Sequence, residues 1–199
     1  MPRASRSCAL VFLLLLCAMP ATAQLKTDGG RGPWDINVWT AGATGEENLN
    51  SFTQAQVWIA GVSFGRLITG DVGSGWRRFQ LEYIVNLVPL FTQWGEQTIR
   101  GGGFEPFVLR FNSTHTLRRA TPYLEFGGGA LFTPVNIPPG RTSDFNFTAR
   151  AGGGFYVGRR NQKSWDIGLH WYHFSNGNLG KYNPQFNSIQ LSIGYHWYR

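Results

Sequence analysis

The chain has 199 residues, with 26 glycines, 15% aromatic residues and only 15% charged residues, a composition typical of many strands joined by tight turns. This length indicates a single domain. The formal net charge is +7, but the basic residues are scattered over expected turns instead of clustering on one element, which argues against a nucleic-acid partner.

The first 23 residues have the three parts of a secretory signal peptide. Two arginines precede an apolar run from Ala9 to Met19, and Ala21-Thr22-Ala23 forms an A-x-A cleavage site. The apolar run is shorter than the ~20 residues that a transmembrane helix needs. We therefore expect residues 1–23 to be cleaved and residues 24–199 to form the exported domain.

Both cysteines, Cys8 and Cys17, lie in the segment that is expected to be removed. The mature chain would then have no disulfide, no cysteine-ligated metal ion and no thiol nucleophile. Its remaining positive balance suits contact with anionic lipid headgroups.

Apolar and polar residues alternate with period two along the rest of the chain, which divides into eight segments. Each is long enough to cross a membrane as a tilted strand of about 9–11 residues. The third segment is the clearest, because Phe79, Leu81 and Tyr83 lie on one face and Gln80 and Glu82 on the other. The expected strands lie near residues 34–43, 55–67, 77–88, 102–112, 121–132, 144–156, 164–174 and 187–198.

An alternating strand suits a soluble sandwich, whose core takes the apolar face, or a membrane barrel, whose apolar face meets lipid. The signal peptide and the C-terminal Tyr195-His196-Trp197-Tyr198 favour the barrel, because aromatic girdles lie where a barrel meets the headgroups. We therefore predict an all-β fold: an eight-stranded antiparallel transmembrane β-barrel over residues 24–199, in the outer membrane of a Gram-negative bacterium. A barrel of this size encloses side chains rather than a pore, which disfavours a general porin.

Three glycine triplets, Gly101–Gly103, Gly127–Gly129 and Gly152–Gly154, fall within the fourth, fifth and sixth expected strands. A phosphate-binding loop needs glycines between a strand and a helix, and no helix is expected after any triplet. We interpret the triplets as positions that relieve crowding in a narrow barrel. Turns and loops are expected at the polar, Gly/Pro-rich stretches Thr69–Gly75, Pro134–Asp144 and Arg159–Lys163.

Even-stranded barrels usually have both termini on the periplasmic side, so the connections from odd to even strands are extracellular. The connection Ser175–Asn187, between the seventh and eighth expected strands, would then lie at the cell surface. Lipopolysaccharide occupies only the outer leaflet, so this connection would lie on the side of the membrane that carries it.

The dense cluster of chemically capable polar residues lies at this connection, in His173–Asn178 and Asn183–Asn187. By alternation, His173, Ser175 and Asn187 all share the lipid-facing parity of the large apolar residues on their strands. A serine beside a histidine that can remove its proton, with a third group orienting the imidazole, is the minimum for attack on an ester. The alternative interpretation is a polar loop entrance, since asparagine and glycine favour turns.

The run His173-Phe174-Ser175-Asn176-Gly177, followed by Asn183-Pro184 and a strand ending in Gly194-Tyr195, resembles the C-terminal signature of the lipid A 3-O-deacylase (PagL) family, also described as acyloxyacyl hydrolases. Segments Leu81–Pro89 and Tyr123–Ala130 resemble its middle strands. The resemblance implies an eight-stranded outer-membrane barrel whose serine and histidine act, from the outer face of the barrel, on an ester-linked 3-hydroxyacyl chain of lipid A.

By this resemblance His173 is the general base, Ser175 the nucleophile and Asn183 a candidate oxyanion donor, while Asn176 supports the nucleophile. Asn187 stands where the family pattern has a glutamate that orients the histidine. An asparagine carbonyl can accept the Nδ1–H of a neutral imidazole, but it brings no full charge to an imidazolium.

Two functions remain open. The first is a serine esterase that removes an acyl chain from lipid A without a cofactor or metal ion, with lipopolysaccharide as substrate and outer-membrane lipids around it. The second is a non-catalytic small barrel with a structural or surface-interaction role, which the missing glutamate favours. Glu82 has lumen parity and Glu125 lies on the fifth expected strand, so neither is expected to replace that glutamate. The sequence leaves open whether the barrel is a monomer or a homodimer.

Overall fold

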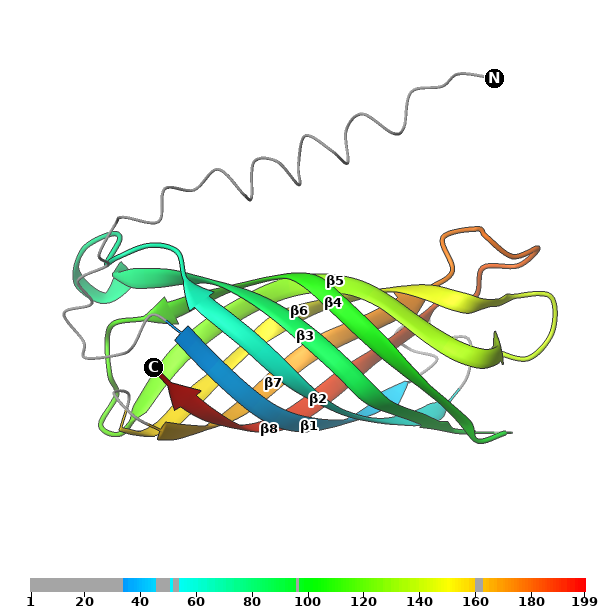
Figure 1. Cartoon of the computed structure of the whole chain (residues 1–199), viewed down its shortest axis with the longest axis horizontal. Helices are drawn as coiled ribbons and strands as arrows, with labels where there is room; N and C mark the ends of the chain where they lie inside the picture. The colour runs from blue at the N-terminus through cyan, green and yellow to red at the C-terminus, as the bar shows by residue number, and fades with distance from the viewer. Residues whose placement is uncertain (1–33, 46–50, 52–53, 96, 160–162) are drawn as a thin grey trace, which may run out of the picture.

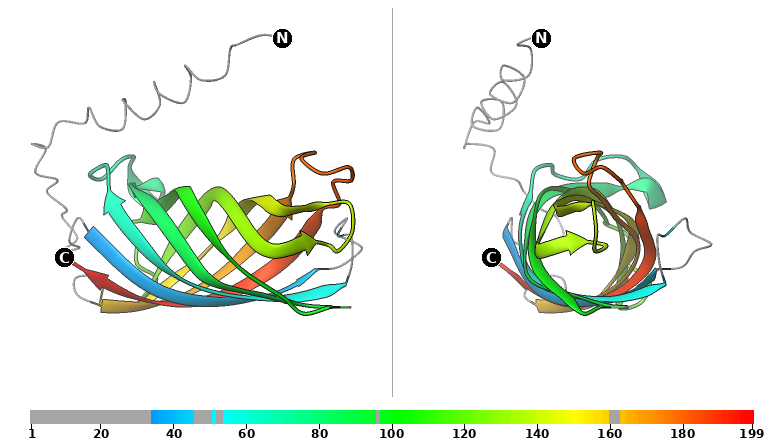
Figure 2. Two further views of the ribbon diagram at one scale, coloured as in Figure 1. Left: turned by 45° about the vertical axis from the view of Figure 1, so that its right-hand side comes forward. Right: turned by 90° about the vertical axis from the view of Figure 1, so that its right-hand side faces the viewer.

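The computed structural model describes residues 34–45, 51, 54–95, 97–159 and 163–199, so the predicted signal peptide lies outside the described residues. Eight strands pair antiparallel in sequence order and close into a barrel (Figures 1 and 2), which confirms the predicted fold. Among the described residues, no helix has the length and apolar character to cross a membrane. The strands are β1 (Trp34–Gly45), β2 (Ala55–Leu67), β3 (Phe79–Trp94), β4 (Ile99–Ser113), β5 (Ala120–Ile137), β6 (Ser143–Arg159), β7 (Lys163–Ser175) and β8 (Phe186–Tyr198).

Some strands extend further than predicted. β5 continues to Ile137 and β6 begins at Ser143, so the loop predicted over Pro134–Asp144 is wrong at both ends. Proline cannot donate a ladder hydrogen bond, and within sheets it is confined to edges and bulges. The barrel places Pro89 of β3 and Pro134 of β5 at register shifts of the ladders, where the strands continue past them.

Side chains alternate between the outer wall and the lumen. On β7 the exposed residues Trp165, Ile167 and Leu169 alternate with buried ones, and on β3 the more exposed face carries Phe79 and Leu81. The outer wall is therefore apolar, as predicted for a surface that faces lipid.

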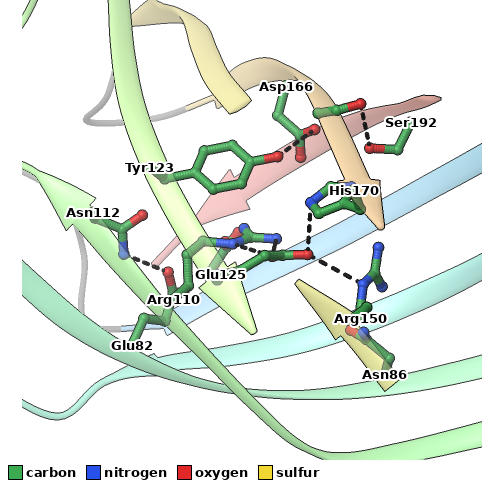
Figure 3. Close-up of polar contacts among 12 residues, drawn as sticks. Glu82, Asn86, Arg110, Asn112, Tyr123, Glu125, Arg150, Asp166, His170 and Ser192 are labelled. Carbon is green, nitrogen blue, oxygen red and sulfur yellow. Dashed lines mark hydrogen bonds and ion pairs between the residues drawn. The ribbon is translucent and has the colours of Figure 1, made fainter. Parts of the chain in front are cut away.

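Part of the lumen is filled by a network of charged and polar side chains (Figure 3). The carboxylate of Glu125 lies 2.6 Å from Arg110, 3.3 Å from Arg150 and 3.0 Å from Nε2 of His170. Glu105 pairs with Arg150 at 3.2 Å. A cavity among these side chains has a volume of about 10 Å³, room for about one water molecule. The interior is packed, as expected for eight strands: this polar network fills one part of it, and a cluster of buried apolar side chains that includes Phe91, Phe174 and Phe186 fills another.

The glycine triplets lie where strands approach closely. A Cβ atom on Gly128 would collide with the carbonyl oxygen of Thr148 on β6, and one on Gly129 would collide with that of Phe104 on β4. The interpretation that the triplets relieve crowding is therefore confirmed.

Both ends of the described barrel sequence meet at one rim. The backbone N–H of Trp34 donates to the carbonyl of Arg199 at 3.0 Å, and the reverse bond is 2.9 Å long. The connections β3–β4, β5–β6 and β7–β8 lie at the opposite rim, on the right in Figure 1, which we call the loop end. That the loop end faces the cell exterior stays a prediction.

Candidate active site

Three polar side chains meet on the outer wall at the loop end of β7 and β8. Ser175 is the last residue of β7, and His173 lies directly opposite Asn187 in the β7–β8 ladder. Nε2 of His173 is 3.1 Å from Oγ of Ser175, and Nδ1 is 2.8 Å from Oδ1 of Asn187. Two neighbouring strands thus bring the three predicted residues into one hydrogen-bonded line.

The amide of Asn187 determines the tautomer of His173. An amide oxygen can only accept, so Nδ1 of His173 carries the proton and donates it to Oδ1 of Asn187. Nε2 is then free to accept the hydroxyl proton of Ser175. This is the tautomer in which an imidazole acts as a base toward a serine.

The line of contacts is shielded at one end and accessible at the other. Asn187 is only 6% exposed, and its backbone N–H donates to Oγ of Ser51, from the connection between β1 and β2, at 3.3 Å. His173 and Ser175 are half-buried. The orienting amide is therefore held away from the outer surface, while the serine hydroxyl stays within reach of a molecule on the outer wall.

Asn176 and Asn183 are brought together in the β7–β8 loop. The side chain of Asn176 donates to the carbonyl of Tyr182 at 2.7 Å and accepts from the N–H of Asn178 at 2.9 Å. Its backbone N–H donates to Oδ1 of Asn183 at 2.9 Å. Asn176 thus fixes the loop directly after Ser175 through its side chain, and its backbone orients the amide of Asn183. The oxyanion role of Asn183 stays a prediction.

Phe147 of β6 is a neighbour of the site that sequence reasoning missed. It pairs with Ser175 in the β6–β7 ladder. Its ring lies beside Gly177, where φ is +60° and a Cβ atom would come within 2.9 Å of the ring. Glycine is required there both for the left-handed turn and for the ring contact. Only the register between the two strands identifies Phe147, and alternation along one strand does not give that register.

Trp171 is a second residue that sequence reasoning left out of the site. Its ring stacks on the imidazole of His173, with centroids 5.4 Å apart and planes inclined by 22°. The spacing of two residues on one face of β7 was a signal that could have found it, because such side chains lie next to each other along a strand.

An apolar groove of about 710 Å³ crosses the outer wall over β4, β5 and β6. Aromatic side chains, including Phe104, Phe126 and Phe147, surround Gly127–Gly129 and Ala130 of β5. The groove exists because these β5 residues have small side chains or none. Phe147 lines the groove and is also the ladder partner of Ser175, so a direct neighbour of the candidate nucleophile forms part of the groove wall.

The acidic residues considered as substitutes for the missing glutamate lie inside the barrel. Glu82 accepts from Asn112 at 2.8 Å, and Glu125 belongs to the arginine network (Figure 3). Neither is on the outer wall with His173. Among the described residues, no group of three or more His, Cys, Asp or Glu side chains is placed to hold a metal ion.

The family model described as lipid A 3-O-deacylase (PagL) matches residues 46–196, which include the whole of β2 to β7 and most of β8. The crystal structure of the outer membrane enzyme PagL superposes with a TM-score of 0.61 at 16% identity, covering 79% of this chain and 97% of that one. Neisserial surface protein A gives a TM-score of 0.47 at 13% identity, covering 84% and 98%. No curated protein sequence matches.

Proposed function

Since this chain belongs to the lipid A 3-O-deacylase (PagL) family of outer-membrane ester hydrolases, we propose that it is an integral serine esterase that removes an ester-linked 3-hydroxyacyl chain from lipid A. The observation that carries the proposal is the hydrogen-bonded line from Ser175 through His173 to Asn187 on the outer wall.

The reaction proceeds in two halves. Oγ of Ser175 attacks the ester carbonyl carbon while its proton passes to Nε2 of His173. The protonated imidazole returns this proton to the sugar oxygen as that oxygen leaves, and the acyl chain remains on Ser175 as an ester. Water then gives a proton to the same nitrogen and attacks this ester. The imidazolium passes that proton to Oγ of Ser175 as the acyl–oxygen bond breaks, which releases the 3-hydroxy fatty acid and restores the serine. These steps use no cofactor.

The negative charge on the carbonyl oxygen needs a hydrogen-bond donor during each attack. We assign this role to the amide NH₂ of Asn183. Its oxygen accepts from the backbone N–H of Asn176, which fixes the amide next to the residue that follows Ser175.

The position of the site suits a substrate that never leaves the membrane. His173 and Ser175 lie on the same apolar wall as Leu169, so the lipid A ester reaches the hydroxyl sideways and not through the filled lumen. The groove lined by Phe147 is about 710 Å³ in volume, within the size range of small-molecule sites. It offers an apolar place for the acyl chain beside Ser175.

The proposal is tested by expressing this chain in a Gram-negative host that has no deacylase of this type. Mass spectrometry of the host's lipid A is the measurement. The wild type is expected to remove the mass of one 3-hydroxyacyl chain, and Ser175→Ala is expected to leave lipid A intact at the same level of folded barrel. Unchanged lipid A with folded wild type in the outer membrane would contradict the proposal. That result would favour the non-catalytic barrel with a structural or surface-interaction role.

A further inference from the structure

The imidazole of His173 has a neutral orienting partner and an aromatic one. At its edge, Nδ1 meets the uncharged amide of Asn187 at 2.8 Å. On its face lies the indole of Trp171, with centroids 5.4 Å apart and planes within 22° of parallel. The face of the indole therefore offers the imidazole a second source of negative charge density, beside the partial charge on the amide oxygen of Asn187.

The proposed reaction places a positive charge on this imidazole when it takes the proton of Ser175. A cation within about 6 Å of an aromatic centroid is attracted by the ring quadrupole, most strongly by tryptophan, and more so away from water. Trp171 lies within that distance. Asn187 holds the tautomer but cannot balance the charge.

We propose that Trp171 is a positioning residue that holds the His173 ring and stabilises its protonated form. It thereby supplies part of the charge stabilisation that a carboxylate at position 187 would supply. The inference rests on the proposed function, because the charge appears only if His173 acts as the base.

The surroundings of Trp171 hold the indole in this place. Its ladder neighbours are Ala151 on β6 and Ile189 on β8. The methyl group of Ala151 leaves room for a large ring on the outer wall, and the branched side chain of Ile189 flanks it on the other strand. Trp171 is 40% exposed, so one part of the indole contacts protein and the rest faces the lipid.

Trp165 provides a matched control for a general lipid-anchoring role. It lies on the same strand and the same face and is 54% exposed, but its ring packs on Tyr195, with centroids 4.9 Å apart, and not on the histidine. Removal of either tryptophan takes an aromatic ring from the lipid-facing wall of β7. Only removal of Trp171 alters the site.

The experiment measures kcat and KM for hydroxyacyl release from lipid A in detergent micelles, with folding checked by heat-modifiable migration. Trp171→Leu is expected to lower kcat about tenfold with little change in KM, Trp171→Phe to lower it less, and Trp165→Leu to leave both constants unchanged. Site-specific fluorinated tryptophan at position 171, which keeps the shape of the ring and weakens its negative face, is expected to lower kcat step by step with each added fluorine.

The Asn187→Glu background separates charge stabilisation from packing. With a carboxylate beside the imidazolium, the loss of kcat on Trp171→Leu is expected to shrink to less than about threefold. The reason is that the carboxylate and the indole then stabilise the same positive charge. Equal losses in both backgrounds, a loss confined to KM, or a fluorine series without effect would overturn the inference while Ser175-dependent activity remains. A folded wild type without activity would overturn the proposed function and this inference with it.

Discussion

His173 and Asn187 are direct partners in the β7–β8 ladder, and 2.8 Å separates Nδ1 of the imidazole from Oδ1 of the amide. Because the ladder register fixes the two backbones, the contact depends only on two side-chain rotamers. Glutamate is one methylene longer than asparagine, and we expect a different rotamer at position 187 to bring its carboxylate to the same nitrogen.

Asn187→Glu is expected to preserve or raise kcat, because a carboxylate accepts the same hydrogen bond and adds charge beside the imidazolium. Asn187→Leu removes the acceptor and is expected to lower kcat by about 100-fold or more. Rates of hydroxyacyl release by purified, folded variants measure both effects. A leucine variant as fast as the wild type would show that His173 needs no orienting partner.

Ala130→Leu tests the groove as the place of the acyl chain. Ala130 lines the groove, so the added carbon atoms should block a long chain and leave a short one unaffected. We expect a drop of about tenfold in kcat/KM for a long-chain ester, since one or two misplaced methylenes cost about 1–3 kcal/mol, and little change for a short-chain ester. Ala120→Leu, at the opposite end of β5, is the control. Equal losses on long and short esters would contradict the assignment.

The orientation of the barrel is testable with single cysteines, because the mature chain is expected to have no native thiol. Leu179 in the β7–β8 loop is 63% exposed, and Leu117 in the turn at the opposite end is 55% exposed. On intact cells an impermeant maleimide should label Leu179→Cys and should reach Leu117→Cys only after the outer membrane is permeabilised. The reverse pattern would invert the predicted topology.

Glu125→Gln tests the lumen network as a source of stability separate from the chemistry. The carboxylate contacts Arg110, Arg150 and His170, so its loss leaves buried cations with less compensation, at a cost of about 3–5 kcal/mol. Urea unfolding in detergent micelles measures the loss, and turnover per folded barrel should stay unchanged because Glu125 faces the lumen. A loss of turnover at full stability would assign Glu125 a role in the reaction.

The strand pattern was predictable because a barrel wall enforces period two between bulges, as Phe79, Gln80 and Leu81 illustrate on β3. The strand ends were less predictable. Pro134 looks like a loop residue in the sequence, but the β5–β6 ladder absorbs it in a register shift and β5 continues to Ile137. Such a shift depends on the neighbouring strand and not on the local sequence.

In the candidate site, too, some features follow from the local sequence and others depend on the neighbouring strands. Alternation alone places His173, Ser175 and Asn187 on one wall, and their contacts follow from the pairing of β7 with β8. Phe147 requires the register of β6 against β7, and the contact of Trp171 with His173 requires a side-chain rotamer. The spacing of residues places Trp171 next to His173 on one face of β7, but it gives neither the strand register nor the rotamer.

The most direct test of the account is the covalent intermediate on Ser175. Purified, folded wild type mixed with lipid A and quenched in acid is expected to carry one 3-hydroxyacyl group on the peptide that contains Ser175, and 3-hydroxy fatty acid should accumulate with time. Ser175→Ala and His173→Ala should each abolish release, and the double variant should be little worse than either, because residues that act as one unit are non-additive. Release that continues in Ser175→Ala would contradict the account, since another group would then be the nucleophile.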